Sequence, residues 1–217
     1  MSSPFPLVVV GAGGHATSVA EVARSSGHRV LAFVDAARAG ASLLGLPVVA
    51  APDEGLAAGA GLAVAIGDNA VRQRVAEALR ERYPAAAFPV LVHASASVSA
   101  YATLGAGSVV MQNASVGANA RVGAFCVVNT AASIDHDTAM ADYASIAPGA
   151  VTGGGVSIGL RSAVSIGAVV KHGVSIGADS VLGAHSYLHA DLPAGRVAWG
   201  SPARVVRSRQ AGDRYLD

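Results

Sequence analysis

The residues best suited to chemistry are a histidine flanked by two acids, Asp135-His136-Asp137. Imidazole is the side chain best suited to proton transfer near neutral pH. A carboxylate that holds one ring nitrogen raises the basicity of the ring, and either Asp135 or Asp137 can take that part. We therefore predict that His136 is a general base. Three polar residues at a turn that faces solvent are the alternative interpretation.

A glycine-rich loop near the N-terminus is the second candidate. Gly11-Ala12-Gly13-Gly14-His15 follows a short apolar run and precedes an amphipathic segment, and Asp35 ends the next apolar run. Glycines let the backbone approach a diphosphate, and the N-terminus of a helix attracts its charge. The loop is therefore predicted to bind phosphate, with a turn that binds no ligand as the alternative.

The first ninety residues contain the elements that must position this loop. Apolar runs predict strands at 7–10, 30–34 and 62–66, and amphipathic segments predict helices at 16–25 and 70–83. Strands that alternate with helices form a parallel sheet, which binds ligands at the carboxyl ends of its strands. Residues 1–90 suffice for only one half of a dinucleotide-binding domain, which favours a nucleotide linked to a small group over NAD. In the second helix, the polar residues are predicted to face solvent: Arg72, Arg74, Glu77, Arg80 and Glu81.

The rest of the chain has a period of six. From Val92 to Leu188 an aliphatic residue or methionine occupies 16 of 17 successive sixth positions, and a small residue usually follows four positions later. Neither a helix nor a flat strand produces this period. Three short strands and three turns per 18 residues do, and the coils stack at about 4.8 Å. We predict a parallel β-helix of hexapeptide repeats over residues 91–217, ending in a C-terminal cap.

Stacking defines the neighbours of His136. Residues 18 apart lie above one another, so Gly154 is predicted beside the ring, where its lack of a side chain leaves a slot. The backbone N–H groups of Gly153–Gly155 are candidates to hold an oxyanion. His172 lies two coils away, about 10 Å, which is too far to share a zinc ion within one chain. The 36-residue spacing resembles that of the hexapeptide-repeat carbonic anhydrases, in which three histidines from two neighbouring subunits bind zinc, so a site across a subunit boundary stays open. That resemblance implies a third histidine near residue 177, where this sequence has Gly177, and no metal is expected.

Composition excludes several classes of protein. The 15 basic and 14 acidic residues leave a net charge of +1, whereas nucleic-acid binding needs a basic surface. The sequence contains no run of about 18 apolar residues, so no membrane span is predicted. The lone Cys126 cannot form an internal disulfide and fits a reducing cytoplasm, and its place in the repeat predicts core packing. We expect a cytoplasmic protein.

Five motifs, in this order, carry a family resemblance: GAGGHA (11–16), FVDA (33–36), AIGDNAVR (65–72), VNTAASIDHD (128–137) and GSPAR (200–204). Together they resemble the sialic-acid and nucleotide-aminosugar acyltransferase family, which includes the bacterial N-acetyltransferases of the bacillosamine, viosamine and perosamine pathways. The resemblance covers nearly the whole chain. It implies a left-handed β-helix, acetyl-CoA as co-substrate and a nucleotide-linked amino sugar as acceptor.

The resemblance also implies site residues. His136 is the general base, supported by Asp137 or Asp135, with Asn129 near the sugar. The acetyl-CoA contacts implied by the family pattern are Ser145, Gly154, Ile166, Ala184, Pro202 and Arg204. The nucleotide-sugar contacts are Gly11, Gly13, Gly14, His15, Asp35, Gly67, Asp68 and Asn69. The prism shape favours a homotrimer with active sites in the clefts between subunits, where the nucleotide domain of one chain faces the coil of the same or the next.

The leading hypothesis is an N-acetyltransferase that acts on the 4-amino group of a nucleotide-linked 4-amino-4,6-dideoxy sugar by direct transfer, in lipopolysaccharide O-antigen biosynthesis. GDP-perosamine is favoured, with UDP- and dTDP-sugars as alternatives. The other candidates are a sialic acid O-acetyltransferase, a zinc-dependent hexapeptide-repeat lyase, a nucleotide-sensing solenoid and a hydride-transfer enzyme. Thiol release from acetyl-CoA, bound metal and NAD(P)H binding separate them.

Overall fold

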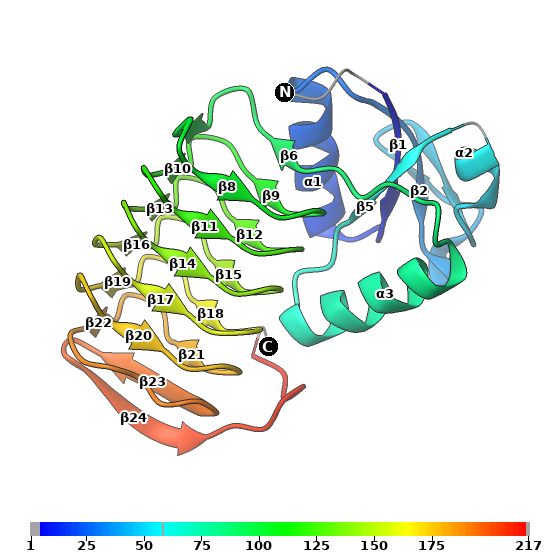
Figure 1. The fold of residues 1–217 in the computed structure, drawn as a ribbon. Coiled ribbons are helices and arrows are strands. Elements are labelled where there is room, and N and C mark those ends of the chain that lie inside the picture. Colours follow the sequence, from blue (N-terminus) through cyan, green and yellow to red (C-terminus); the bar gives the residue numbers. More distant parts are fainter. Residues whose placement is uncertain (1–4, 58, 216–217) are drawn as a thin grey trace.

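The N-terminal part of the molecule is a small α/β layer structure. A computed structural model describes residues 5–57 and 59–215 (Figure 1). Its first sheet has the order β3-β4-β2-β1-β5, in which only β3 is antiparallel to its neighbour. The strands are β1 (Pro6–Val10), β2 (Arg29–Val34), β3 (Ser42–Leu43), β4 (Leu46–Val49) and β5 (Gly61–Val64). The helices are α1 (Gly14–Ser25), α2 (Asp53–Ala57) and α3 (Asn69–Arg82), with a 3-10 turn at Ala36–Arg38.

The three predicted strands and two predicted helices of this part are confirmed. The sequence predicts no element between Asp35 and Gly61, where the structure has β3, β4 and α2. These elements have two to five residues, and Gly45 and Pro47 interrupt the apolar run. Elements this short show no periodicity that a sequence can reveal.

From Leu91 the chain forms a left-handed parallel β-helix, as expected (Figure 1). Strands of two residues pair with those 18 positions away, as Ser115 does with Ser133. Face I consists of β6 (Leu91–Val92), β9 (Val109–Val110), β12 (Val127–Val128), β15 (Ser145–Ile146), β18 (Ala163–Val164) and β21 (Val181–Leu182), extended by β23 (Arg196–Gly200) and β24 (Ala203–Ser208). Face II consists of β7 (Ser97–Val98), β10 (Ser115–Val116), β13 (Ser133–Ile134), β16 (Val151–Thr152), β19 (Val169–Val170) and β22 (Tyr187–Leu188). Face III consists of β8 (Thr103–Leu104), β11 (Arg121–Val122), β14 (Ala139–Met140), β17 (Ser157–Ile158) and β20 (Ser175–Ile176).

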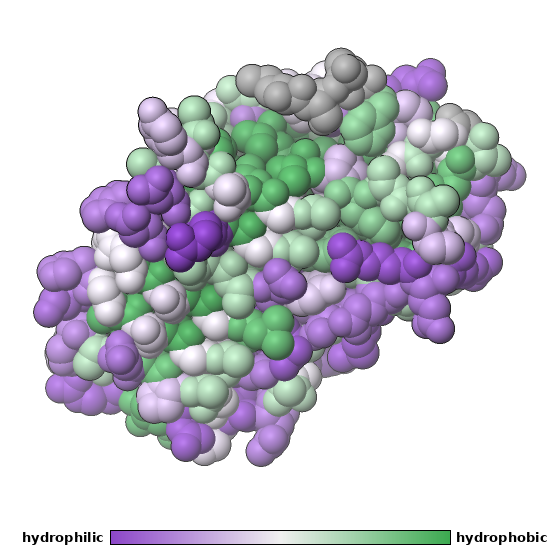
Figure 2. All heavy atoms as spheres, viewed as in Figure 1, coloured by the Kyte–Doolittle hydropathy of each residue, from purple (hydrophilic) through white to green (hydrophobic). Residues whose placement is uncertain are grey.

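The residues at every sixth position fill the interior, as predicted. Residues such as Val110, Ile134 and Leu182 are fully or almost fully buried in one continuous core. Cys126 belongs to the same core, and burial raises the pKa of its thiol to about 12. Hydrophilic residues gather along one edge of the coils, near the strands of face II from β10 to β22 (Figure 2). No helix in the described ranges has the length and apolar character needed to cross a bilayer.

The turns of the coil need two kinds of special residue. Non-glycine residues adopt a left-handed conformation at many corners, Asp137 among them with φ of 58°. The glycines that directly follow the aliphatic positions serve another purpose, because a Cβ at Gly117 would lie 2.6 Å from the backbone nitrogen of His136. Close stacking of coils, rather than unusual dihedral angles, requires these glycines.

The two parts are joined by an apolar contact and a buried arginine. Helix α1 packs on face I, where Leu91, Val109 and Val127 share its core. Arg72 was predicted to face solvent, but it is 1% exposed. Its guanidinium donates to the carbonyls of Phe125 (2.8 Å), Tyr143 (2.8 Å), Ile66 (2.8 Å) and Gly67 (2.9 Å) and to the side-chain oxygen of Asn69 (2.6 Å).

Replacement of Arg72 by methionine should destabilise the protein strongly. The substitution leaves several buried carbonyl oxygens without donors, so we expect a loss of at least about 3 kcal/mol in the free energy of unfolding. The measurement is the midpoint of urea unfolding, with Arg74→Met on the exposed side of α3 as the matched control. Equal midpoints for the two variants would contradict the role assigned to Arg72.

Candidate active site

The imidazole of His136 is oriented by one of its two flanking acids. The ring lies on the turn between β13 and β14, and its Nδ1 is 2.7 Å from Oδ2 of Asp137. The other oxygen of Asp137 accepts from the side chain of Asn119 (3.3 Å), one coil above. Asp135 instead accepts the backbone N–H of His136 (2.7 Å). Asp137 is therefore the carboxylate that holds the ring.

Charge around His136 favours its basic form. The hydrogen bond to Asp137, followed by the charge of Asp135, raises the pKa of His136 above its usual value. The same bond lowers the pKa of Asp137. The side chain of His136 is 61% exposed, so its ring is accessible for proton transfer.

Gly154 provides the predicted slot. A Cβ built there would lie 2.4 Å from both Cε1 and Nε2 of His136. No other residue type leaves room for the ring in this position. The coil below also fixes the turn, because the N–H of Gly155 donates to the carbonyl of His136 (2.8 Å).

The glycine loop begins helix α1 directly after β1. Gly11 has φ of +116°, and a Cβ there would lie 2.7 Å from the carbonyl oxygen of Ala65, so glycine is required. Gly13 is the N-cap of α1 without a side-chain cap, and a Cβ at Gly13 or Gly14 would meet open space. The first turn of α1 thus presents an uncapped N-terminus at an accessible loop, which suits an anion.

His15 is the most unusual residue of this loop. Its Nε2 is buried and has no hydrogen-bond partner among the described residues. Burial, with a smaller effect of the Arg72 charge, lowers the pKa of His15 to about 4. The ring is therefore neutral at physiological pH, and its orphaned nitrogen suits a polar group of a ligand.

Of the other residues expected at the nucleotide site, three are partly exposed and the fourth, Asn69, is buried. Gly67 lines the same groove as His15. Asp35 and Asp68 are partly exposed and cap helical turns, accepting from the N–H groups of Ala37 (3.0 Å) and Val71 (2.9 Å). The side chain of Asn69 is fully buried and donates to the carbonyls of Arg161 and Ser162. Its amide connects α3 to the coil.

A groove of about 800 Å³ runs along face I from the glycine loop to the last coil. His15, Gly67 and Asn129 lie at its N-terminal end, and Ser145, Ile166 and Ala184 line its length. Trp199 and Arg207 lie at the other end, on the β23–β24 hairpin. Pro202 and Arg204 belong to this hairpin but do not line the groove within the described ranges.

The predicted site residues therefore occupy two separate surfaces of one chain. Asn129, Ser145, Ile166 and Ala184 lie along the groove on face I, whereas His136 and Gly154 lie on the edge between faces II and III. In a three-sided prism that edge is opposite face I. A single chain thus does not bring its histidine to its own groove.

Comparisons with known proteins identify the family. Residues 6–79 match the model of the PglD N-terminal domain. A histidine-to-alanine variant of GDP-perosamine N-acetyltransferase from Caulobacter crescentus, solved with CoA and GDP-perosamine, is 35% identical, with a TM-score of 0.87 over 93% of this chain and 97% of that one. The chain belongs to the perosamine- and bacillosamine-type N-acetyltransferase family.

Two further structures match this acetyltransferase. The acetyltransferase domain of PglB from Neisseria gonorrhoeae, solved with acetyl coenzyme A, is 33% identical, with a TM-score of 0.85 over 94% of this chain and all of that one. WeeI from Acinetobacter baumannii shares the fold at 21% identity and a TM-score of 0.75, over 93% of this chain and all of that one. A comparison with curated proteins found no match.

Several residues around the acetyltransferase groove were not predicted. Trp199 is 55% exposed and lines the groove. Arg38 hydrogen-bonds to the carbonyl of Ala12 in the glycine loop. For the far end of the groove, the sequence offered one signal, which is a lone tryptophan followed by arginines just beyond the repeats. Across the described ranges, no group of three or more metal-binding side chains of His, Cys, Asp or Glu comes together.

Proposed function

We propose that the chain transfers the acetyl group of acetyl-CoA to the 4-amino group of a nucleotide-linked 4-amino-4,6-dideoxy sugar, with GDP-perosamine as the favoured acceptor. The observation that carries the proposal is the imidazole of His136, held by Asp137 and stacked over Gly154 on an exposed edge of the coil. The relatives described above were solved with CoA, acetyl-CoA and GDP-perosamine, and the groove on face I has the size of a cofactor site.

The reaction is a direct transfer. The neutral sugar amine attacks the thioester carbonyl, and His136 takes a proton from the attacking nitrogen. The backbone N–H of Gly154 is assigned to the oxyanion of the tetrahedral intermediate. Collapse of this intermediate breaks the carbon–sulfur bond, and the departing sulfur takes the proton from His136 and leaves as the CoA thiol. Cys126 takes no part as a nucleophile, because it is buried and its pKa is raised to about 12.

The nucleotide end of the acceptor is assigned to the glycine loop. The N-terminus of α1 at Gly13 and Gly14 attracts the diphosphate. The neutral His15, whose Nε2 has no partner among the described residues, takes a polar group of the sugar or phosphate. Asp35 and Gly67 stand at the carboxyl ends of β2 and β5, where a parallel sheet binds its ligands.

The active site is proposed to form between subunits of a homotrimer. The support is the separation described above: His136 and Gly154 lie on the edge opposite the groove. A threefold arrangement of prisms places the edge of one chain against a face of the next. The assignment favours the coil of the neighbouring subunit, rather than the same chain, as the partner of the nucleotide domain.

Loss of the Asp137 carboxylate should move the pH profile of the reaction. His136 accepts a proton only when it is neutral, and its hydrogen bond to Asp137 raises its pKa above 6.5. The acid limb of log kcat/KM against pH should therefore lie above 6.5 in the wild type and move to lower pH in Asp137→Asn. Asp142→Asn, at another turn of the coil, is the control. A limb unmoved in Asp137→Asn would show that another group titrates.

A substrate screen tests the proposed function directly. Purified protein is mixed with acetyl-CoA and GDP-, UDP- or dTDP-linked 4-amino sugars, and released thiol is followed. Sialic acid serves as the acceptor for the O-acetylation alternative. We expect selective thiol release with one of the amino sugars. The proposed role is that of a cytoplasmic enzyme of O-antigen biosynthesis. Release with sialic acid alone, or with no acceptor, would overturn the proposal.

A further inference from the structure

The chain continues beyond the β23–β24 hairpin into a strap, residues 209–215, which folds back over face I. At its start the buried Arg209 donates to the carbonyl of Asp179 (2.8 Å) on the coil and to the carbonyl of Asp213 (2.6 Å) in the strap. The N–H of Gln210 closes the turn onto the carboxylate of Asp213 (2.9 Å). One arginine therefore fixes both ends of the turn.

The far end of the strap is Tyr215. Its ring packs on Ala163, Val181 and Val197, the outward-facing residues of three neighbouring strands of face I. These three residues are at most 5% exposed although they lie outside the core of the coil. The guanidinium of Arg209 lies 5.2 Å from the centre of the Tyr215 ring.

The hydroxyl of Tyr215 lies near the groove residue Ser145 and the start of α3. The side chain of Ser145 and the backbone of Asn69 at the start of α3 are its polar neighbours. Burial is the main cause of its raised pKa, so the phenol stays protonated. Tyr215 thus connects the strap, the middle of the groove and the N-terminal end of the helix that follows Gly67.

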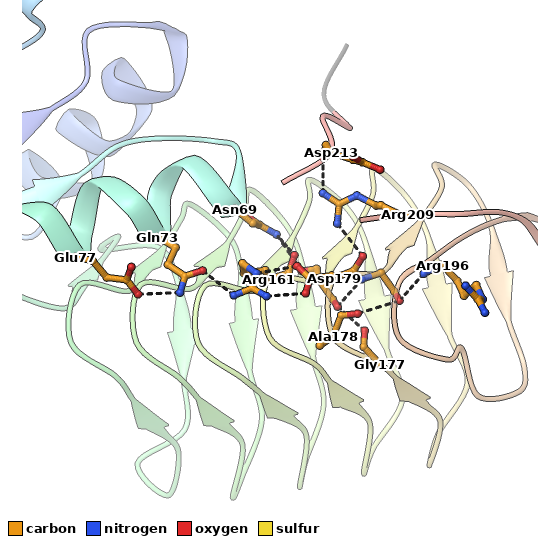
Figure 3. Close-up of polar contacts among 12 residues, drawn as sticks. Asn69, Gln73, Glu77, Arg161, Gly177, Ala178, Asp179, Arg196, Arg209 and Asp213 are labelled. Atoms are coloured by element: carbon orange, nitrogen blue, oxygen red, sulfur yellow. Dashed lines mark hydrogen bonds and ion pairs between the residues drawn. The ribbon is translucent and has the colours of Figure 1, made fainter. Parts of the chain in front are cut away.

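A polar network holds the strap to both parts of the protein (Figure 3). Arg161 pairs with Asp179 through two contacts of 2.6 and 2.7 Å, and it also donates to Gln73 of α3 (2.8 Å). Asp179 offers its carbonyl to Arg209 in the same network. The strap is therefore a positioned element of the fold rather than a free end.

We propose that this strap is a wall of the acetyl-CoA groove and that Tyr215 sets the affinity for the acetyl donor. The inference rests on the proposed function. Tyr215 lines the groove together with the donor candidates Ser145 and Ile166, and about 800 Å³ remain open beside it. A strap that plugged the groove would leave no such volume. A rigid aromatic wall excludes water from the bound thioester arm at little cost in entropy.

The test compares Tyr215→Ala and Tyr215→Phe with Gln210→Ala, an exposed residue of the same strap. We expect Tyr215→Ala to raise KM for acetyl-CoA about tenfold, with kcat and the KM of the sugar within about twofold of wild type. The KM of Tyr215→Phe for acetyl-CoA should lie between those of the wild type and Tyr215→Ala, since this variant keeps the ring and loses the hydroxyl. An unchanged KM for acetyl-CoA in Tyr215→Ala would overturn the proposal. A lowered KM would overturn it as well, because the strap would then compete with the donor.

A second measurement uses the unmodified protein and does not depend on an acceptor. Hydrogen exchange of residues 209–215 is followed with and without CoA. We expect slower exchange when CoA is bound; equal or faster exchange would contradict the role of the strap. This readout needs no acceptor, so a wild type in which CoA slows the exchange of residues 209–215 but which acetylates no sugar would refute the proposed function and still support the role of the strap.

Discussion

His136→Asn should reduce kcat/KM by about 10²–10⁴-fold while the fold and substrate binding persist. Asparagine keeps a polar side chain in the slot over Gly154 but cannot accept a proton from the amine. Transfer would then rely on positioning of the two substrates alone. Because the side chain is exposed and lies outside the core, the unfolding midpoint should change little.

The decisive comparison for this variant is with a histidine that has no assigned role. His93→Asn, at the first turn of the coil, changes the same residue type near Ser95, and its activity should equal that of the wild type. Steady-state rates with acetyl-CoA and the amino sugar found in the screen give the answer. A His136→Asn enzyme with more than about a tenth of wild-type kcat/KM would mean that another group is the base.

The repetitive part of the fold was predictable because each inward position has the same environment. Every sixth residue must be apolar to fill a narrow prism, and the period survives in 16 of 17 positions. The glycine loop was visible for a similar reason, since Gly11 sits where a Cβ would strike Ala65. In both cases a steric requirement at the position itself restricts the residue type.

The features that the sequence did not reveal depend on contacts between distant segments. Arg72 has the composition of an exposed helix residue, and only the carbonyls of Phe125 and Tyr143 make its burial possible. The strap has no period, so its return to face I could not be foreseen. The choice between Asp135 and Asp137 depends on the left-handed conformation of Asp137, which turns its carboxylate back to the ring.

This separation of signals also explains why the site looks incomplete in one chain. The family motifs identify Asn129 and His136 seven residues apart, yet the coil carries them to different edges of the prism. Proximity in sequence is a poor guide in a solenoid, where 18 residues bring the chain back above itself and six carry it to another face. A second subunit is the simplest way to bring the base to the groove.

Two inactive variants should therefore restore activity when they form mixed trimers. His136→Asn removes the base and leaves the groove, whereas Ala147→Trp fills the groove and leaves the base. If each site combines the groove of one subunit with the His136 of the next, any mixed trimer contains one intact site. Random mixing of equal amounts should then recover about a quarter of wild-type activity.

The mixture is prepared by unfolding and refolding the two variants together, and thiol release is compared with that of each variant refolded alone. Wild-type protein refolded in the same way sets the full scale, and gel filtration verifies that the assembly has the same size in every sample. No recovery in mixed assemblies of the correct size would mean that His136 serves the groove of its own chain. That result would require a movement large enough to carry the II–III edge of the prism to face I, which the continuous core of the coil does not permit.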